Sequence, residues 1–316
     1  MHIPVALDRC IALLTPAIER AISERGEAVV IDATLGLGGH SRELLARFPQ
    51  LRIIGLDRDL AAIAIATQNV SDFSDRITIV HTVYDEILPV LQSLELTSVD
   101  GILFDLGVSS MQLDQGERGF AYSHEAPLDM RMDQSQGQSA FDVLHNYDRS
   151  ALIRILRQYG EEKFAPRIAD NIIAARSEGK LRTTTELAEL VKESIPAPAR
   201  RTGGNPAKRT FQALRIEVNN ELGVLERAIP AALEAIAIGG RVVVMSYQSL
   251  EDKVVKRDFA RVVQSGTPRG LPIELPGSAA KFKLLFAGSE SASEQEIIEN
   301  PRAASMRLRG IERVAS

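Results

Sequence analysis

Residues 31–40, Ile-Asp-Ala-Thr-Leu-Gly-Leu-Gly-Gly-His, combine a carboxylate with a run of glycines. Asp32 follows the apolar run Ala28–Ile31, and a helical pattern begins at about Ser41. The glycines between them are Gly36, Gly38 and Gly39. Backbone N–H groups of such a turn approach a ligand without interference from Cβ atoms, and the helix N-terminus favours an anionic group. The pattern predicts a turn that binds a nucleotide-like cofactor.

The spacing of these glycines discriminates among cofactors. A dinucleotide fingerprint needs Gly-x-Gly-x-x-Gly, and Ser41 stands at its sixth position. A P-loop ends in Gly-Lys-Ser/Thr, which does not occur here. The spacing acid-x-x-x-Gly-x-Gly, from Asp32 to Gly38, is the one that class I methyltransferases use for S-adenosylmethionine. A tight turn without a ligand is the alternative.

Acidic and aromatic residues follow the next two apolar runs. Asp57 ends the run Arg52–Leu56, where a carboxylate can accept hydrogen bonds from both ribose hydroxyls of an adenosine ligand. Nicotinamide enzymes also place an acid there, and a solvated acid at a strand end is a further alternative. Tyr84 and Asp85 follow Ile77–His81, where a ring can stack on adenine. An ordinary surface tyrosine explains Tyr84 equally well.

Asp105 ends a fourth apolar run, Val99–Phe104, beside the crevice where open α/β sheets bind ligands. A base amine delocalises its lone pair into the ring, and its methylation requires a pyramidal nitrogen. An acceptor for the amine hydrogens favours that geometry and aligns the nitrogen with a methyl group. Asp105 is therefore the candidate catalytic residue. It can instead hold the cofactor's amino group or cap the turn at Gly107.

The elements that must position these residues are strands alternating with helices, which predicts a parallel, doubly wound sheet. The first two predicted helices are Ser41–Phe48 and Leu60–Asn69. A fifth strand, Arg241–Ser246, follows the amphipathic stretch Phe211–Ile238 and a stop at Gly239-Gly240. Two more β-like runs close the chain, at Lys281–Ala287 and within Ser305–Arg313.

The fourth and fifth strands are separated by about a hundred residues more than a crossover needs. We interpret residues 113–208 as an inserted helical substrate-recognition domain, and residues 1–112 with 209–316 as the cofactor-binding domain. The predicted helices of the inserted domain are Ala140–Leu144, Arg149–Tyr159, Pro166–Ser177 and Thr184–Ser194. Thr184 is a candidate N-cap, and Ile195–Pro206 is predicted as a loop.

The composition excludes several classes of protein. The chain has 316 residues, a net charge of −5, one cysteine and five histidines without close ligand spacing. We therefore expect no disulfide framework and no metal site. No apolar run approaches the length of a membrane span, and Met1–Cys10 has no signal-peptide pattern. The protein is expected to be cytoplasmic, and binding of nucleic acid would require a local basic patch.

Long, unusual strings occur in the same order as in one known family. They are IDATLGLGGHS from Ile31, DGILFDLGVSSMQLD from Asp100, ERGF from Glu117, PLDMRMD from Pro127, YGEEKFAPRIA from Tyr159, RTFQALRIEVNNEL from Arg209, SLEDKVVK from Ser249 and NPRAASMRLR from Asn300. On these strings the chain resembles the bacterial ribosomal RNA small subunit methyltransferase H family (MraW-type). The resemblance implies a class I (Rossmann-like) S-adenosylmethionine methyltransferase sheet with an inserted helical domain.

The resemblance also implies a cofactor pocket at Gly38, Gly39, His40, Asp57, Tyr84, Asp105 and Gln112. Only the resemblance points to His40 and Gln112, which are otherwise an ordinary residue near a helix start and a polar residue at the start of the insertion. The N-terminus departs from the family, because Ala6 and Arg9 stand where Leu and Glu are usual.

The family methylates N4 of a cytidine in the decoding region of 16S rRNA, so the implied partner is 16S rRNA or the small ribosomal subunit. Candidate phosphate contacts lie in one basic window: Arg200, Arg201, Lys208 and Arg209. A solvated charge run is the commoner fate of such stretches. Asp129 and Arg131 are candidates for the cytidine pocket, or they form a salt bridge within a turn.

The sequence therefore predicts an S-adenosylmethionine-dependent rRNA (cytosine-N4-)-methyltransferase, without membrane association and compatible with a homodimer. Two alternatives come from other classes. One is a non-catalytic RNA-binding or ribosome assembly factor that retains a cofactor pocket. The other is a nicotinamide-dependent oxidoreductase, which the absence of a glycine at the sixth fingerprint position disfavours.

Overall fold

The computed structural model describes residues 4–109, 111–112, 115–200, 205–265 and 278–315. The chain divides into two compact units. We call Met1–Gly107 with Leu222–Ser316 the sheet unit, and Val108–Glu221 the helical unit. The predicted insertion, residues 113–208, lies within the helical unit. Its role in substrate recognition stays a prediction.

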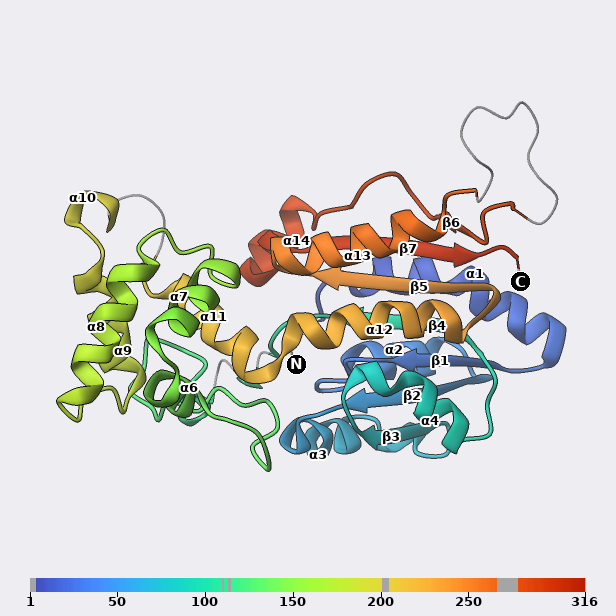
Figure 1. Ribbon diagram of the computed structural model, residues 1–316. Helices are drawn as coiled ribbons and strands as arrows, with labels where there is room; N and C mark the ends of the chain where they lie inside the picture. The colour runs from blue at the N-terminus through green and yellow to red at the C-terminus, as the bar shows by residue number, and fades with distance from the viewer. Residues whose placement is uncertain (1–3, 110, 113–114, 201–204, 266–277, 316) are drawn as a thin grey trace. The chain divides into compact units, whose positions relative to one another are not determined.

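The sheet unit contains a seven-stranded sheet of order β3-β2-β1-β4-β5-β7-β6 (Figure 1). Its strands are β1 (Ala28–Asp32), β2 (Leu51–Asp57), β3 (Ile77–His81), β4 (Val99–Asp105), β5 (Ile236–Ser246), β6 (Phe282–Leu284) and β7 (Arg307–Arg313). The first five strands are parallel to one another, whereas β7 runs antiparallel to both of its neighbours, β5 and β6. The predicted α/β class and parallel sheet are thereby confirmed, with an antiparallel pair added at one end.

The central strands β1 and β4 are apolar and buried along almost their whole length, and helices cover both faces of the sheet (Figure 1). Alternate residues point to opposite faces: Ile31 and Phe104 join one core, and Val30 and Leu103 join another. The helices and short turns of this unit are α1 (Leu7–Arg25), α2 (Gly39–Arg47), α3 (Leu60–Asn69), η1 (Ser71–Phe73), η2 (Tyr84–Glu86), α4 (Ile87–Ser93), α12 (Glu221–Ala235), α13 (Ser249–Val262), α14 (Glu294–Glu299) and η4 (Pro301–Ser305). No helix among the described residues is long and apolar enough to cross a membrane.

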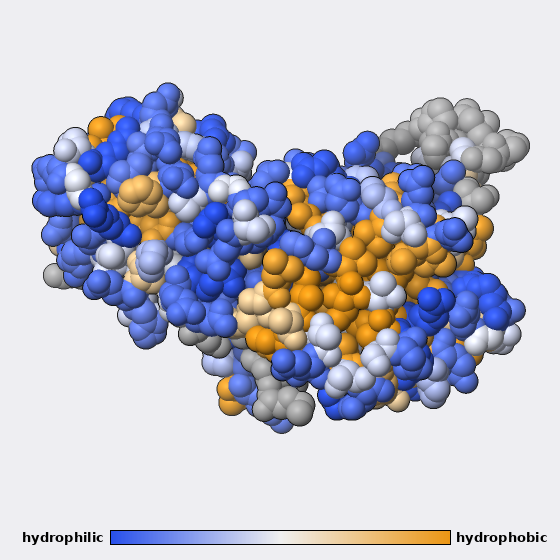
Figure 2. Space-filling view, turned by 90° about the horizontal axis from the view of Figure 1, so that it is seen from below, coloured by the Kyte–Doolittle hydropathy of each residue, from blue (hydrophilic) through white to orange (hydrophobic). Residues whose placement is uncertain are grey.

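Part of the sheet unit's surface is apolar, as Figure 2 shows on the face turned to the viewer. Helix α3 contributes to the apolar surface of the unit, because its sequence LAAIAIATQN has polar side chains only in the last three positions. Leu60, its first residue, is 53% exposed.

The helical unit has its own buried core, which includes Leu152, Ile155, Ile168 and Phe211. Its elements are η3 (Gly116–Arg118), α6 (Ala140–Asn146), α7 (Arg149–Gln158), α8 (Ala165–Ser177), α9 (Thr184–Ser194), α10 (Ala197–Arg200) and α11 (Lys208–Asn219). The four predicted helices are confirmed. A short helix, α10, occupies part of the predicted loop.

Three details of the prediction were wrong. The amphipathic stretch 211–238 is two helices, since Asn220 adopts φ 49° between α11 and α12. The helix stops at Ala235 rather than at the glycines, and β5 continues through them with a register shift opposite β4. The N-cap of α9 is Thr183, which forms a capping box with Glu186.

Asp100 joins the start of β4 to β1 and α1. Its carboxylate is 1% exposed, accepts the Val29 N–H at 2.9 Å and pairs with Arg25 at 2.6 Å. A buried backbone N–H without a partner carries its full desolvation cost. The side chain therefore supplies a hydrogen bond that the strand ladder does not.

We expect Asp100→Ala to lower the free energy of unfolding by about 1–3 kcal/mol, because it leaves the Val29 N–H buried and unpaired. Asp8→Ala is the matched control, since the Asp8–Arg47 pair is exposed to solvent and such pairs contribute little to stability. Urea unfolding measures both. Equal midpoints for the two variants would contradict the assigned role of Asp100.

Candidate active site

The turn between β1 and α2 depends on close approach of the backbone. Gly36 and Gly38 have φ values of 52° and 78°, where other residues are strained. A Cβ on Gly38 would lie 3.1 Å from Cγ1 of Val70, and one on Gly39 would lie 2.5 Å from Cγ of Pro4. The glycines therefore allow a tight, left-handed turn packed between two other segments.

Asp57 connects the end of β2 to this turn. Its Oδ2 accepts the Gly36 N–H at 2.7 Å, and its Oδ1 accepts the Asp59 N–H at 2.8 Å. Burial raises the pKa of Asp57 to about 6, against the opposing effect of these two hydrogen bonds. Each carboxylate oxygen has a second acceptor site, so Asp57 can also accept hydroxyl groups of a ligand.

Asp105 lies at the end of β4 and is held from both sides. Its N–H donates to Oγ1 of Thr34 at 2.6 Å, and the Tyr247 hydroxyl donates to its Oδ1 at 2.7 Å. Burial, together with the Asp105 charge, raises the pKa of Tyr247, so the phenol remains a donor at neutral pH. Sequence reasoning missed Tyr247. Its position directly after β5, the neighbour of β4, was the available signal.

His40 and Asp32 lie beneath the turn, and both are buried. Asp32 accepts the Ser41 hydroxyl at 2.6 Å, and Nε2 of His40 lies 3.1 Å from the Val5 carbonyl oxygen. Burial raises the pKa of Asp32 and lowers that of His40. His40 therefore links α2 to the N-terminal segment, and its contact with a cofactor stays a prediction.

Tyr84 packs its ring edge-to-face against Phe104, with centroids 5.8 Å apart and planes at 89°. The ring is thus fixed in orientation at the end of β3 and is only partly buried. Its neighbour Asp85 pairs with Arg227 at 2.7 Å. A fixed, partly open aromatic face suits stacking on a planar ring.

The sheet unit brings most of the predicted cofactor residues to one edge of the sheet. The register pairs Asp32 with Gly55 and with Leu103, so the ends of β1, β2 and β4 are neighbours. Gln112 belongs to the helical unit, where its Oε1 accepts the Ser109 N–H at 3.0 Å. Its contact with a cofactor remains untested.

The predicted substrate residues belong to the helical unit. Asp129 and Arg131 form a two-pronged ion pair of 2.7 and 3.0 Å, the salt bridge weighed as an alternative. Although burial raises the pKa of Asp129, hydrogen bonds from Arg131 hold it below its ordinary value. In the basic window, Arg200 donates to the Ile195 carbonyl and Arg209 to the Glu161 carbonyl, while Lys208 is exposed and Arg201 lies outside the described residues.

The glycine turn, the strand-end carboxylates and the parallel sheet define a class I S-adenosylmethionine-dependent methyltransferase. The chain belongs to the MraW methylase family, whose model matches residues 1–314. This outcome confirms the resemblance inferred from the sequence.

Two curated relatives are named ribosomal RNA small subunit methyltransferase H. The one from Renibacterium salmoninarum is 58% identical over 99% of this chain and 95% of its own. The one from Mycolicibacterium smegmatis is also 58% identical, over 99% of this chain and 84% of its own. A crystal structure of an rRNA methylase from Streptococcus thermophilus aligns with 99% of each chain, at 11% identity and a TM-score of 0.44.

The residues present fit S-adenosylmethionine. Asp57 has acceptor sites that a ribose diol could use, and the partly exposed ring of Tyr84 could stack on adenine. Among the described residues, no group of three His, Cys, Asp or Glu side chains is placed to hold a metal ion.

We expect the affinity for S-adenosylmethionine to rise about fivefold from pH 5 to pH 6, about twofold more above pH 6, and then to level off by about pH 7–8. If the ribose hydroxyls favour ionised Asp57, binding lowers a pKa that stands at about 6 in the free protein. Binding should then release close to one proton well below pH 6 and close to none well above it. Isothermal titration calorimetry across this range measures the dependence.

Asp57→Asn is the control for this prediction, because it removes the titrating group and should leave a weak affinity that hardly varies with pH. Asp32 and His40 are further buried titratable groups near the turn. If Asp57→Asn retained the full pH dependence, Asp57 would be excluded as its source.

Proposed function

We propose that this protein transfers a methyl group from S-adenosylmethionine to the N4 amine of a cytidine in the decoding region of 16S rRNA. The observation that carries the proposal is Asp105, a carboxylate fixed at the end of β4 by the Tyr247 hydroxyl. The names of the two relatives, each 58% identical to this chain, support small-subunit rRNA as the substrate. The family strings of the sequence support the N4 position.

In this proposal, some residues of the sheet unit bind the cofactor and another orients the substrate amine. S-adenosylmethionine supplies a methyl group bound to a positively charged sulfur. Asp57 accepts the ribose hydroxyls, Tyr84 stacks on the adenine, and Asp105 accepts a hydrogen of the substrate amine. That hydrogen bond favours the pyramidal nitrogen and aligns its lone pair with the methyl carbon. A nitrogen–carbon bond forms, a sulfur–carbon bond breaks, and the amine proton leaves to water.

No strong general base is needed, because the methylated amine of cytosine is only weakly basic. Because the proton is lost easily, the rate depends mainly on the alignment of the amine nitrogen with the methyl carbon and on the acceptor oxygen of Asp105. Tyr247 contributes by holding that oxygen, and it keeps its own proton at neutral pH.

RNA binding is assigned to the helical unit. Its candidates are Asp129 and Arg131 for the nucleotide, and Arg200, Arg201, Lys208 and Arg209 for phosphates. The net charge of −5 makes such a local cluster necessary. In this proposal the protein acts in the cytoplasm on 16S rRNA or the small ribosomal subunit, and a homodimer is compatible with it.

The decisive test uses a strain that lacks the gene, complemented with the wild type or with Asp57→Ala. We expect N4-methylcytidine in 16S rRNA to be restored by the wild type and to fall below about a tenth of that amount with Asp57→Ala, since the ribose contact is lost. Nucleoside analysis by mass spectrometry measures it. Unchanged N4-methylcytidine in the deletion strain would favour the RNA-binding assembly factor. Calorimetric binding of NAD without binding of S-adenosylmethionine would favour the oxidoreductase.

Asp105 and Tyr247 should differ in the size of their effects. Asp105→Ala removes the acceptor and should lower kcat by about 10²–10³, as the loss of one preorganised transition-state contact does. Tyr247→Phe removes one hydrogen bond to that acceptor and should lower kcat about 2- to 10-fold. Single-turnover methylation of small subunits measures both. An Asp105→Ala variant as active as Tyr247→Phe would exclude Asp105 as the amine acceptor.

A further inference from the structure

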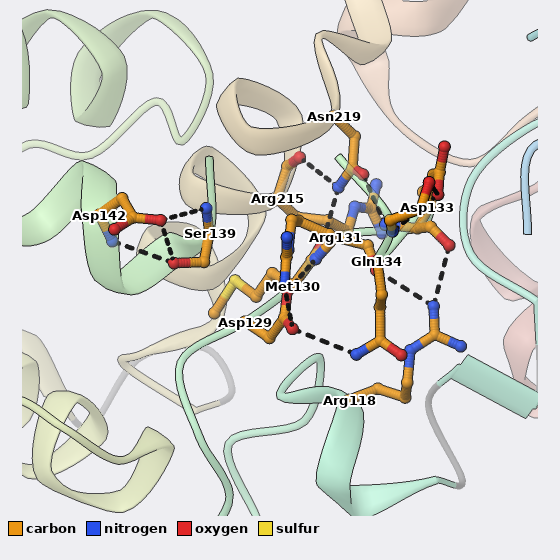
Figure 3. Close-up of polar contacts among 12 residues, drawn as sticks. Arg118, Asp129, Met130, Arg131, Asp133, Gln134, Ser139, Asp142, Arg215 and Asn219 are labelled. Atoms are coloured by element: carbon orange, nitrogen blue, oxygen red, sulfur yellow. Dashed lines mark hydrogen bonds and ion pairs between the residues drawn. The ribbon is translucent and has the colours of Figure 1, made fainter. Parts of the chain in front are cut away.

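The backbone of residues 129–132 in the helical unit is held by a buried amide. Asn219, the last residue of α11, accepts the Met132 N–H at 2.8 Å and donates to the Met130 carbonyl at 2.7 Å. It also donates to the Arg215 carbonyl at 3.0 Å. Its side chain is 2% exposed and lies against this loop in Figure 3. The Asn219 side chain, nearly ninety positions away in the sequence, thus makes backbone hydrogen bonds with this loop that a neighbouring strand would otherwise make.

A buried guanidinium holds the same loop from another element. Nη2 of Arg118, at the end of η3, donates to the carbonyls of Arg131 at 3.1 Å and Met132 at 3.0 Å. The residue is 4% exposed, and its guanidinium lies 5.8 Å from the centre of the Phe120 ring. Burial of a charged group is costly, so its use on two backbone carbonyls indicates that the loop must keep one shape.

The held shape is one that the loop would not adopt freely. Met130 has φ 61°, the left-handed region, although its side chain is fully buried. Its N–H donates to the Arg118 carbonyl at 3.1 Å, which closes the clamp around this residue. Strained backbone persists where surrounding contacts determine it and gathers at functional sites.

This shape places the side chains of Asp129 and Arg131 together at the surface. Their side chains are 16% and 26% exposed, and Gln134 also donates to Asp129 at 3.1 Å (Figure 3). A carboxylate accepts amine hydrogens, and a guanidinium donates to ring nitrogens and carbonyl oxygens. Together they can match the polar edge of a nucleobase that has been taken out of a helix, in exchange for hydrogen bonds that they make with each other and with Gln134.

We propose that Asn219 and Arg118 are positioning residues for substrate binding, holding residues 129–132 so that Asp129 and Arg131 meet the substrate nucleotide. This inference rests on the proposed function. It predicts a particular kinetic signature. Without the clamp, only a fraction of molecules has the competent loop, and the apparent affinity for RNA falls by that fraction. At saturating RNA the bound nucleotide selects the competent loop, so the maximal rate is kept.

The experiment compares Asn219→Ala and Arg118→Lys with the wild type, using small subunits from the deletion strain. We expect KM for the subunit to rise about 5- to 100-fold, the equivalent of losing one or two buried hydrogen bonds. We expect kcat to change less than about twofold, and the dissociation constant of S-adenosylmethionine to stay unchanged. Hydrogen exchange at the Met132 amide should accelerate in Asn219→Ala.

Ser194→Ala is the matched control. Ser194 is a fully buried polar residue of the same unit, bonded to Leu190 and Asn171 and not to residues 129–132. It should destabilise the unit without raising KM. Circular dichroism and cofactor binding establish that each variant is folded, and Arg118→Lys carries the test if Asn219→Ala does not fold.

Three outcomes would overturn the inference. An unchanged KM in folded clamp variants would show that the loop does not need the clamp. An equal rise of KM in Ser194→Ala would assign the effect to general destabilisation. A fall in kcat at unchanged KM would place the residues in another step. A wild-type protein inactive on small subunits would instead remove the proposed function, and the inference with it.

Discussion

The site depends on one constraint: the carboxyl ends of parallel strands meet at one edge of the sheet, where backbone donors hold buried carboxylates. Asp57 shows the consequence most directly. Its two oxygens bind N–H groups of the glycine turn and of the start of α3, so one side chain sets the distance between β2 and both segments. The carboxylate proposed to contact the ligand therefore also holds the turn in place.

The helical unit also holds candidate binding residues in place, but it does so without a sheet. A sheet edge positions side chains through strand register, but residues 129–132 belong to no strand. Side chains from η3 and α11 supply the missing hydrogen bonds, and a buried methionine is held in a left-handed conformation between them. Both units therefore use polar side chains, hydrogen-bonded to backbone groups, where the shape of a loop or turn must be fixed.

The sequence was informative where a rule links adjacent residues. The strands β1, β2 and β4 could be predicted because mostly buried strands are nearly continuous apolar runs, and each of these three ends in an aspartate. Helix α1 was not predicted, since Pro16 interrupts its pattern, yet the helix continues through it. Tyr247 and Asn219 were missed because their roles come from partners far along the chain, Asp105 and Met132, which no local pattern reports. The Thr184 cap failed by one position, since the choice between adjacent threonines depends on which is buried.

Ionised Asp57 lowers the stability of the free protein, although the proposed function uses this ionised form. Burial raises the pKa of Asp57 to about 6, and the charges of Asp59 and Asp32 add to the shift. An acid with a raised pKa stabilises the fold below its unfolded value near 4, and that contribution is lost as the pH rises through 6. At neutral pH, ionised Asp57 therefore costs about 3 kcal/mol of folding free energy. In the proposed function the same ionised form accepts a ribose diol, so the group that weakens the free protein is one whose charge ligand binding would stabilise.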